Sequence, residues 1–104
     1  MPSAAPAARR SICVAIMCYN EAASLERVVG EIRAELQRLG VDHEVVIIDD
    51  GSTDGSREIA DRLAREVPEV RVVHHPVNLG LGAVYREAFR CGTKELATAF
   101  PADG

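Results

Sequence analysis

The amino-acid sequence predicts an α/β fold in which helices cover both faces of a parallel sheet. Short runs of branched apolar residues alternate with longer stretches whose apolar residues recur every three or four positions. The first pattern is typical of buried strands and the second of amphipathic helices. Their order is strand, helix, strand, helix, strand, helix, strand, which favours parallel strands joined by right-handed crossovers.

The strands are predicted at four short apolar runs, at residues 12–16, 45–48, 70–73 and 96–100. Parallel strands that are covered on both faces read as continuous apolar runs rather than as alternating ones. The run at residues 45–48 contains only Val and Ile, so we expect it to be a fully buried strand.

The first predicted helix follows Asn20, which we expect to cap it, and ends at Gly40. Its apolar residues have the spacing of one helix face: Leu25, Val28, Val29, Ile32, Leu36 and Leu39. Apolar residues at positions 59, 63 and 67 mark a second helix, which Ser52 or Asp54 would cap. A third helix is predicted from about residue 83 to residue 92.

A length of 104 residues suits one small domain. Residues 1–10 are mostly Ala, Pro, Ser and Arg, which predicts a disordered extension and leaves residues 11–104 for the folded part. The chain stops soon after the fourth predicted strand. Because such sheets usually have further strands, we expect this chain to be part of a larger protein.

The composition excludes several classes of protein. The net charge is −4, and no basic stripe with interleaved aromatic residues is present, so nucleic acid is not an expected partner. Three cysteines without a Cys-x-x-Cys pair predict buried thiols in a reducing compartment, which indicates a cytoplasmic location. No stretch is long and apolar enough to cross a membrane, and we expect no secretory signal.

Two adjacent carboxylates, Asp49 and Asp50, directly follow the second predicted strand. They would repel each other unless something binds there. Open α/β sheets bind ligands at the carboxyl ends of their strands, and Gly51 lets the backbone turn tightly there. The sequence therefore predicts a ligand site at this turn.

Two further loops are expected at the same edge of the sheet, and they carry Tyr19, Asn20 and Glu21 after the first strand and Asp103 after the fourth. An aromatic ring can stack on a nucleobase, and carboxylates accept hydrogen bonds from base and ribose groups. An Asp beside a diphosphate would suit Mg²⁺ or Mn²⁺. Structural roles remain open for the first loop: a helix cap, a charge at the helix N-terminus or a cover for the sheet edge.

Other nucleotide and metal sites fit the sequence less well. A dinucleotide-binding turn needs glycines where residues 17–21 have none, and no Walker-type Gly-Lys-Ser/Thr is present. A phosphoacceptor receiver domain has its acidic pair after the first strand, not the second. His74 and His75 are neighbours on a predicted strand, so they point to opposite faces and cannot easily share one metal ion.

Three segments taken together resemble family 2 glycosyltransferases of the GT-A fold. They are Tyr19-Asn20-Glu21, the acidic turn at residues 49–54 and the Asn-Leu-Gly-Leu-Gly-Ala segment at residues 78–83. The resemblance covers about residues 12–104. The last segment is similar to the dolichyl-phosphate mannose synthase branch, which transfers a sugar to polyprenyl phosphate.

This resemblance implies a Rossmann-like, nucleotide-sugar-binding half of a GT-A domain. Tyr19, Glu21 and Asp50 would hold the nucleoside of a UDP- or GDP-sugar, and Met17 and Asp49 would complete the nucleotide-binding set. Met17 stands where the family usually has Pro.

The resemblance also implies a metal ligand. Asp103 matches the last acid of the family's Asp-x-Asp motif and would bind Mg²⁺ or Mn²⁺ beside the diphosphate. Pro101 and Ala102 stand where the family often places its first acid. Catalytic residues on the acceptor side would lie further along a full-length chain and are unknown.

The expected function is transfer of a sugar, with inversion, from a nucleotide-sugar donor to an acceptor, for which polyprenyl phosphate is the candidate. This part alone would bind the donor without catalysing transfer. Further segments would hold the protein at the inner face of a membrane. The alternatives are a non-catalytic nucleotide-binding module of the same fold and a nucleotidyltransferase, although the latter would need a basic glycine-rich loop. Nothing in the sequence indicates the oligomeric state.

Overall fold

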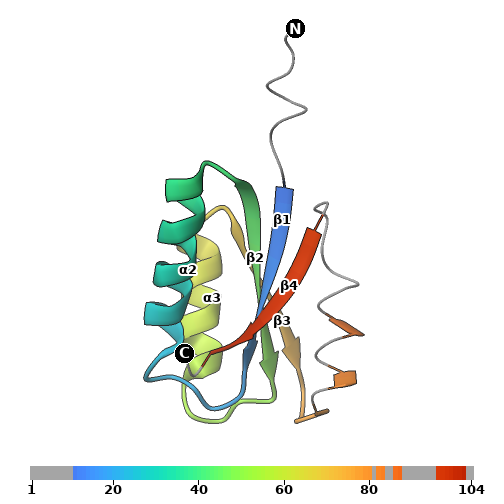
Figure 1. The fold of residues 1–104 in the computed structure, drawn as a ribbon. Helices are drawn as coiled ribbons and strands as arrows, with labels where there is room; N and C mark the ends of the chain where they lie inside the picture. The colour runs from blue at the N-terminus through green and yellow to red at the C-terminus, as the bar shows by residue number, and fades with distance from the viewer. Residues whose placement is uncertain (1–10, 81, 84–85, 88–95, 103–104) are drawn as a thin grey trace, which may run out of the picture.

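A computed structural model describes residues 11–80, 82–83, 86–87 and 96–102. Four parallel strands form one sheet, as the alternation of elements predicts, and their order in the sheet is β3-β2-β1-β4 (Figure 1). The elements are β1 (Ser11–Cys18), α2 (Leu25–Leu39), β2 (Asp42–Asp50), α3 (Ser56–Glu66), β3 (Val70–His75) and β4 (Leu96–Pro101).

Each of the four strands extends beyond its predicted apolar run. The largest extension is in β2, which takes in both Asp49 and Asp50 at its carboxyl end. These two residues are in register with His74 and His75 on β3. The strand continues through these polar residues because each has a histidine partner on β3. The hydropathy of the sequence does not reveal such partners.

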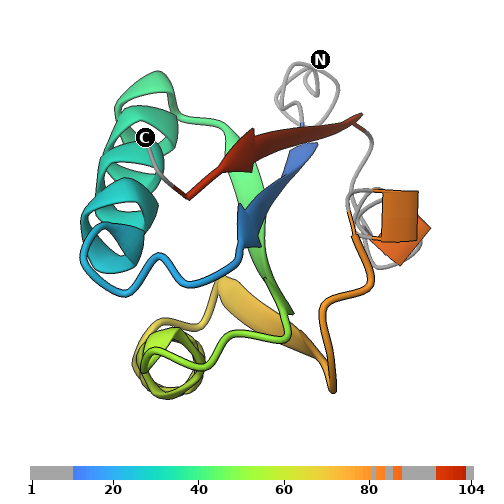
Figure 2. The same cartoon turned by 90° about the horizontal axis from the view of Figure 1, so that it is seen from below.

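The two faces of the sheet are covered differently. Helices α2 and α3 lie side by side on one face, and the helical residues 82–83 and 86–87 lie on the other (Figure 2). The larger apolar core lies under α2 and α3 and contains Ile16, Leu25 and Ile47, all fully buried. The rest of the third predicted helix lies outside the described residues.

The helix ends correct two predictions. Helix α2 begins at Leu25 with Ser24 at the N-cap position, so the prediction that Asn20 caps it is wrong. Asn20 has a left-handed backbone, with φ of 54°, and its side chain has another partner. Gly40 ends α2 in a left-handed conformation, as predicted, and its N–H donates to the carbonyl oxygen of Gln37 over 3.1 Å.

Helix α3 has Gly55 at its N-cap position, so neither Ser52 nor Asp54 stands there. Asp54 nevertheless accepts the N–H of Ser56, the first residue of the helix.

Cys13 and Cys18 are buried thiols, as predicted, and Cys91 lies outside the described residues. Burial raises the pKa of the Cys18 thiol, against hydrogen bonds that act the other way. Within the described part of the chain, neither helix has the length and apolar character needed to span a bilayer.

Candidate functional site

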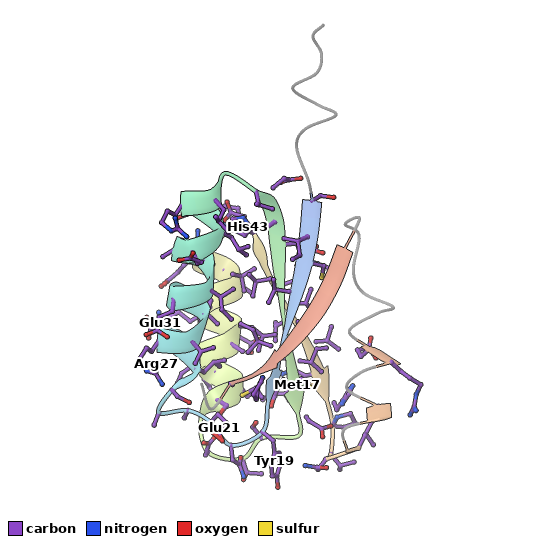
Figure 3. The ribbon with its side chains drawn as sticks, in the orientation of Figure 1. Met17, Tyr19, Glu21, Arg27, Glu31 and His43 are labelled. Atoms are coloured by element: carbon purple, nitrogen blue, oxygen red, sulfur yellow. The ribbon has the colours of Figure 1, made fainter. Side chains whose placement is uncertain are left out.

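The predicted site residues of the first loop lie where β1 ends. Figure 3 shows Met17, Tyr19 and Glu21 at the end of the sheet that the strand arrows point to. Tyr19 is 48% exposed, whereas Met17 and Glu21 are half-buried. The ring of Tyr19 therefore has free surface at the edge where ligands are expected.

The turn after β2 holds the loop after β1 through side chains. Three successive backbone N–H groups of the first loop donate to side-chain oxygens of the second: Asn20 to Ser52 Oγ (3.0 Å), Glu21 to Ser56 Oγ (3.0 Å) and Ala22 to Asp54 Oδ2 (3.1 Å). In return, the N–H of Thr53 donates to Asn20 Oδ1 over 2.7 Å. We refer to these four hydrogen bonds, between residues 20–22 and 52–56, as the loop clasp.

Asp54 has a larger role than the predicted helix cap. Its Oδ1 accepts the N–H of Ser56, the first residue of α3, over 3.0 Å, and the Ser56 hydroxyl over 2.6 Å. Its Oδ2 belongs to the loop clasp. The Ser56 hydroxyl, together with the N–H groups of Ala22 and Ser56, lowers the pKa of the Asp54 carboxyl. Asp54 therefore joins the start of α3 to the first loop.

Asp49 points to the face covered by α3. Its side chain is fully buried, and its oxygens accept the N–H of Ser52 (3.0 Å) and lie 2.7 Å from His74 Nδ1. The other ring nitrogen of His74 lies 2.7 Å from Asp61 Oδ1 on α3, and Arg57 approaches Asp49 to 4.0 Å. We call Asp49, His74, Asp61 and Arg57 the helix-side cluster.

Burial alone would lower the pKa of His74, but the hydrogen bonds with Asp61 and Asp49 outweigh it and raise that pKa. A protonated His74 donates from both ring nitrogens, one to each carboxylate. The helix-side cluster thus ties the end of β2 to α3.

Asp50 points to the opposite face and is 5% exposed. Its Oδ1 lies 2.8 Å from His75 Nδ1 and accepts the N–H of Leu79 over 2.9 Å, and its Oδ2 accepts the N–H of Gly80 over 3.0 Å. Glu87 lies 3.8 Å from the other nitrogen of His75. We call Asp50, His75, Leu79 and Gly80 the loop-side cluster.

Burial would raise the pKa of Asp50, but the hydrogen bonds from His75 and from the N–H groups of Leu79 and Gly80 more than offset it. The pKa of this carboxyl therefore lies below its ordinary value. Asp50 is consequently ionised at neutral pH and is organised as an acceptor of N–H donors.

The predicted reason for a ligand at Asp49 and Asp50 is wrong, although the position of the two residues is as expected. Adjacent residues on a strand point to opposite faces, so the two carboxylates face different surroundings and do not repel each other at close range. The same alternation separates His74 from His75.

Gly51 brings the turn after β2 against the loop after β3. Its φ is 78°, and a Cβ built there would lie 2.5 Å from both the Val77 carbonyl carbon and the Asn78 nitrogen. Only a residue without a side chain permits this approach of two backbones. Gly51 therefore lets the loop at residues 77–80 close onto Asp50.

The end of β4 reaches the same edge of the sheet. Pro101 is in register with Met17, and the N–H of Ala102 donates to the Met17 carbonyl oxygen over 2.9 Å. The Ser24 hydroxyl donates to the carbonyl oxygen of Ala102 over 2.6 Å. Asp103, the predicted metal ligand, lies outside the described residues, among which no group of three or more His, Cys, Asp or Glu side chains is arranged to hold a metal ion.

The sequence reasoning missed the partners of the two carboxylates. His74 and His75 lie 25 positions after Asp49 and Asp50, at the end of the next strand. Aligning the ends of the two predicted strands would have suggested both pairs. Ser24 was also missed, and no local pattern links it to Ala102, which is 78 positions away.

Comparisons with known proteins agree with the predicted fold. The model of the family described as glycosyl transferase family 2 matches residues 13–104. The mannosyltransferase PcManGT of Pyrobaculum calidifontis, solved in complex with GDP-Man and Mn²⁺, is similar in structure with a TM-score of 0.75 and 27% sequence identity. That similarity covers 94% of this chain and 29% of the other.

Two curated relatives are similar in sequence. The succinoglycan biosynthesis protein ExoA of Rhizobium meliloti is 42% identical over 82 residues, which cover 79% of this chain and 24% of the relative. The undecaprenyl-phosphate mannosyltransferase of Micrococcus luteus is 35% identical over 92 residues, which cover 86% of this chain and 36% of the relative. The chain thus spans about a quarter to a third of the length of these two relatives.

Proposed function

The chain belongs to glycosyl transferase family 2 and has the GT-A fold, and we propose that residues 11–104 form the donor-binding part of a sugar transferase. The donor is a UDP- or GDP-sugar. The observation that carries the proposal is that a carboxylate, Asp50, and an exposed aromatic ring, Tyr19, come at the ends of two neighbouring strands. Cys18 and Asp49 are register partners, so Tyr19, the first residue after β1, and Asp50, the last residue of β2, both lie at the ligand-binding edge of the sheet.

Each nucleoside contact follows from the chemistry of the side chain. Asp50 accepts an N–H group of the base: unlike Asp49 it keeps some exposed surface, and a carboxylate oxygen that accepts one N–H group, as Oδ2 does from Gly80, can accept a second. Tyr19 stacks on the base, and Glu21 accepts hydrogen bonds from the ribose hydroxyls. Met17 packs on the face of the sheet that carries Asp50 and forms an apolar wall.

Asp49 belongs to the site as a positioning residue rather than as a contact. Its side chain has no exposed surface, and its oxygens are engaged by Ser52 and His74. It shapes the turn from which Asp50 and Gly51 are presented.

Asp103 is the proposed ligand for Mg²⁺ or Mn²⁺. In favour of this role, Ala102 is fixed at the carboxyl edge of the sheet beside the first loop, and a carboxylate is the kind of ligand that hard cations prefer. The ion would act as a Lewis acid that stabilises the leaving nucleotide. The Mn²⁺ in the similar mannosyltransferase complex supports the choice of metal.

The proposed acceptor is polyprenyl phosphate, which the name of the Micrococcus luteus relative supports. Its phosphate oxygen is anionic near neutral pH, so direct displacement with inversion needs little help from a general base. We further propose that the full-length protein works in the cytoplasm at the inner face of a membrane, where such an acceptor is found.

Nucleotide binding by the full-length protein tests this proposal. Titration calorimetry with UDP and GDP in the presence of Mn²⁺ should show binding of one of them. Asp50→Asn should weaken that binding about tenfold or more, because an amide presents an N–H group where the base needs an acceptor. Asp54→Asn is the control and should change the affinity less than twofold or so, since Asp54 acts through the loop clasp. A larger effect of Asp54→Asn than of Asp50→Asn would contradict the roles of these two carboxylates.

A non-catalytic nucleotide-binding module is the second candidate. It is favoured by Pro101 and Ala102, which replace the first acid of the metal motif. Nucleotide binding that is independent of Mn²⁺ and unaffected by Asp103→Ala would support this candidate over the transferase.

A further inference from the structure

The carboxylate of Asp50 already accepts hydrogen bonds at most of its positions. An ionised carboxylate offers about four acceptor positions, shared equally by its two oxygens. Oδ1 lies 2.8 Å from His75 Nδ1 and accepts the N–H of Leu79 over 2.9 Å, so both positions of that oxygen are taken. Among the described residues, Oδ2 has a single hydrogen-bond donor, the N–H of Gly80, at 3.0 Å. One acceptor position of Asp50 therefore remains for a ligand.

His75 determines which oxygen keeps that position. It is in register with Asp50 at the ends of β3 and β2, and the two side chains are only 8% and 7% exposed. An ionised carboxylate has no proton to give, so Nδ1 of His75 carries the proton of this hydrogen bond. Rotation of the carboxylate would move Oδ1 away from Nδ1 and break the bond. Oδ1 therefore stays turned to His75 and Leu79, and Oδ2 is the oxygen that meets a ligand.

The bases of the two proposed nucleotides differ in how many hydrogen-bond donors they present side by side. Guanine presents two, N1–H and the 2-amino group, which match both oxygens of one carboxylate. Uracil presents a single N–H between two carbonyl oxygens. A carboxylate with one remaining acceptor position satisfies uracil but leaves one N–H group of guanine without an acceptor, which is costly once the contact is desolvated.

We propose that His75 is a positioning residue that makes the site select uracil over guanine, so that the sugar donor is a UDP-sugar. His75 acts through Asp50, because it holds the carboxylate with only one oxygen available to the base. This inference rests on the proposed function, in which Asp50 binds the base, and it selects between the two nucleotides named there.

Calorimetry on the full-length protein with UDP, GDP and IDP, in one buffer with Mn²⁺, tests the selectivity. UDP should bind about tenfold more tightly than GDP. IDP has the N1–H of guanine but lacks the 2-amino group, so it should bind at least as tightly as GDP. If GDP instead binds about tenfold more tightly than IDP, both oxygens of Asp50 serve the base, and the inference is overturned.

His75→Phe tests the role of the histidine. Phenylalanine keeps a ring at this buried position but has no N–H, so the carboxylate of Asp50 can rotate and present both oxygens. The affinity ratio of UDP to GDP should therefore fall about fivefold. His75→Asn places an amide N–H near the position of Nδ1 and should keep the wild-type ratio. His75→Gln places its amide near the position of Nε2 instead, so it should lower the ratio and replaces His75→Phe if that variant does not fold.

His74→Phe is the matched control. It makes the same change at the neighbouring histidine, which contacts Asp49, whereas His75 contacts Asp50. It should lower the stability and leave the ratio of UDP to GDP unchanged. An equal fall of the ratio in His74→Phe would attribute the effect to disturbed strand ends and overturn the role of His75.

The outcomes separate this inference from the proposed function. A wild-type ratio in both His75→Phe and His75→Gln overturns the role of His75. A wild type that binds GDP as tightly as UDP, or more tightly, overturns the selectivity and leaves the proposed donor site in place. A wild type that binds neither UDP nor GDP overturns the proposed donor site itself.

Discussion

The helix-side and loop-side clusters are both built on an Asp–His pair, yet the pairs have different further partners. Each has a buried aspartate of β2 paired with a histidine of β3. On the helix side, the second ring nitrogen of His74 contacts Asp61 of α3, so the cluster joins a strand to a helix. On the loop side, Asp50 accepts the backbone N–H groups of Leu79 and Gly80.

The difference supports the proposed division of roles between the two carboxylates. Asp49 has side-chain and turn partners that stabilise the fold and leave it no exposed surface. Asp50 is presented to N–H donors of a loop, and the edge of a nucleobase offers donors of the same kind. In the proposed division, Asp49 stabilises the fold and Asp50 binds the base. Four predictions, from the largest expected effect to the smallest, test this division.

Asp49→Asn should cost about 3 kcal/mol of stability, because it removes one partner of a buried charged pair. In urea denaturation the free energy of unfolding should fall by this amount. The nucleotide affinity of the protein that remains folded should change little. If Asp49→Asn weakens nucleotide binding more than Asp50→Asn does, the roles of the two clusters are reversed.

Gly51→Ala should lower the free energy of unfolding by about 2–3 kcal/mol. The added Cβ meets the backbone of Val77 and Asn78, and the positive φ of Gly51 is unfavourable for alanine. It should also weaken nucleotide binding, because the loop-side cluster loses its geometry. Gly55→Ala is the control: its φ of 101° is strained, but a Cβ there meets nothing within 4 Å. Gly55→Ala should lower the free energy of unfolding by about 1 kcal/mol and leave the nucleotide affinity unchanged. Equal effects of the two variants would show that the close approach is unimportant.

Asp54→Ala should lower the free energy of unfolding by about 1–2 kcal/mol, because the loop clasp loses one of its hydrogen bonds. Hydrogen exchange at the Ala22 amide should become faster, because that N–H loses its acceptor. Glu58→Ala removes an exposed charge in the same first turn of α3 without contacting Ala22. Faster exchange at Ala22 in Glu58→Ala as well would attribute the effect to the helix charge instead.

His74 should give the smallest effect, seen as a dependence of stability on pH. The folded pKa of His74 lies above its ordinary value of 6.5, because Asp61 and Asp49 outweigh burial and the repulsion from Arg57. The stabilisation is therefore complete below pH 6.5 and is lost as the pH rises through the folded pKa. The difference in unfolding free energy between the wild type and His74→Gln should therefore become smaller as the pH rises above 6.5. A difference that grows with pH would refute the assignment.

Much of the fold was predictable from local patterns. The four strands follow runs of branched apolar residues, and α2 follows a regular apolar spacing that ends at Gly40. The ends of β2 were less predictable, because Asp49 and Asp50 continue the strand only through partners on β3. Asn20 illustrates the same limit: it has the side chain of a cap, but its local backbone is left-handed and its oxygen accepts the N–H of Thr53.

The sequence by itself determined the order of the elements and the edge at which Tyr19, Glu21 and Asp50 lie, because periodicity and turn residues act over short distances. The tertiary structure alone decided what each polar side chain does. Asp49 and Asp50 differ in role because strand alternation sends them to faces with different neighbours. Ser24 reaches Ala102 rather than its own helix because the sheet brings these distant positions together.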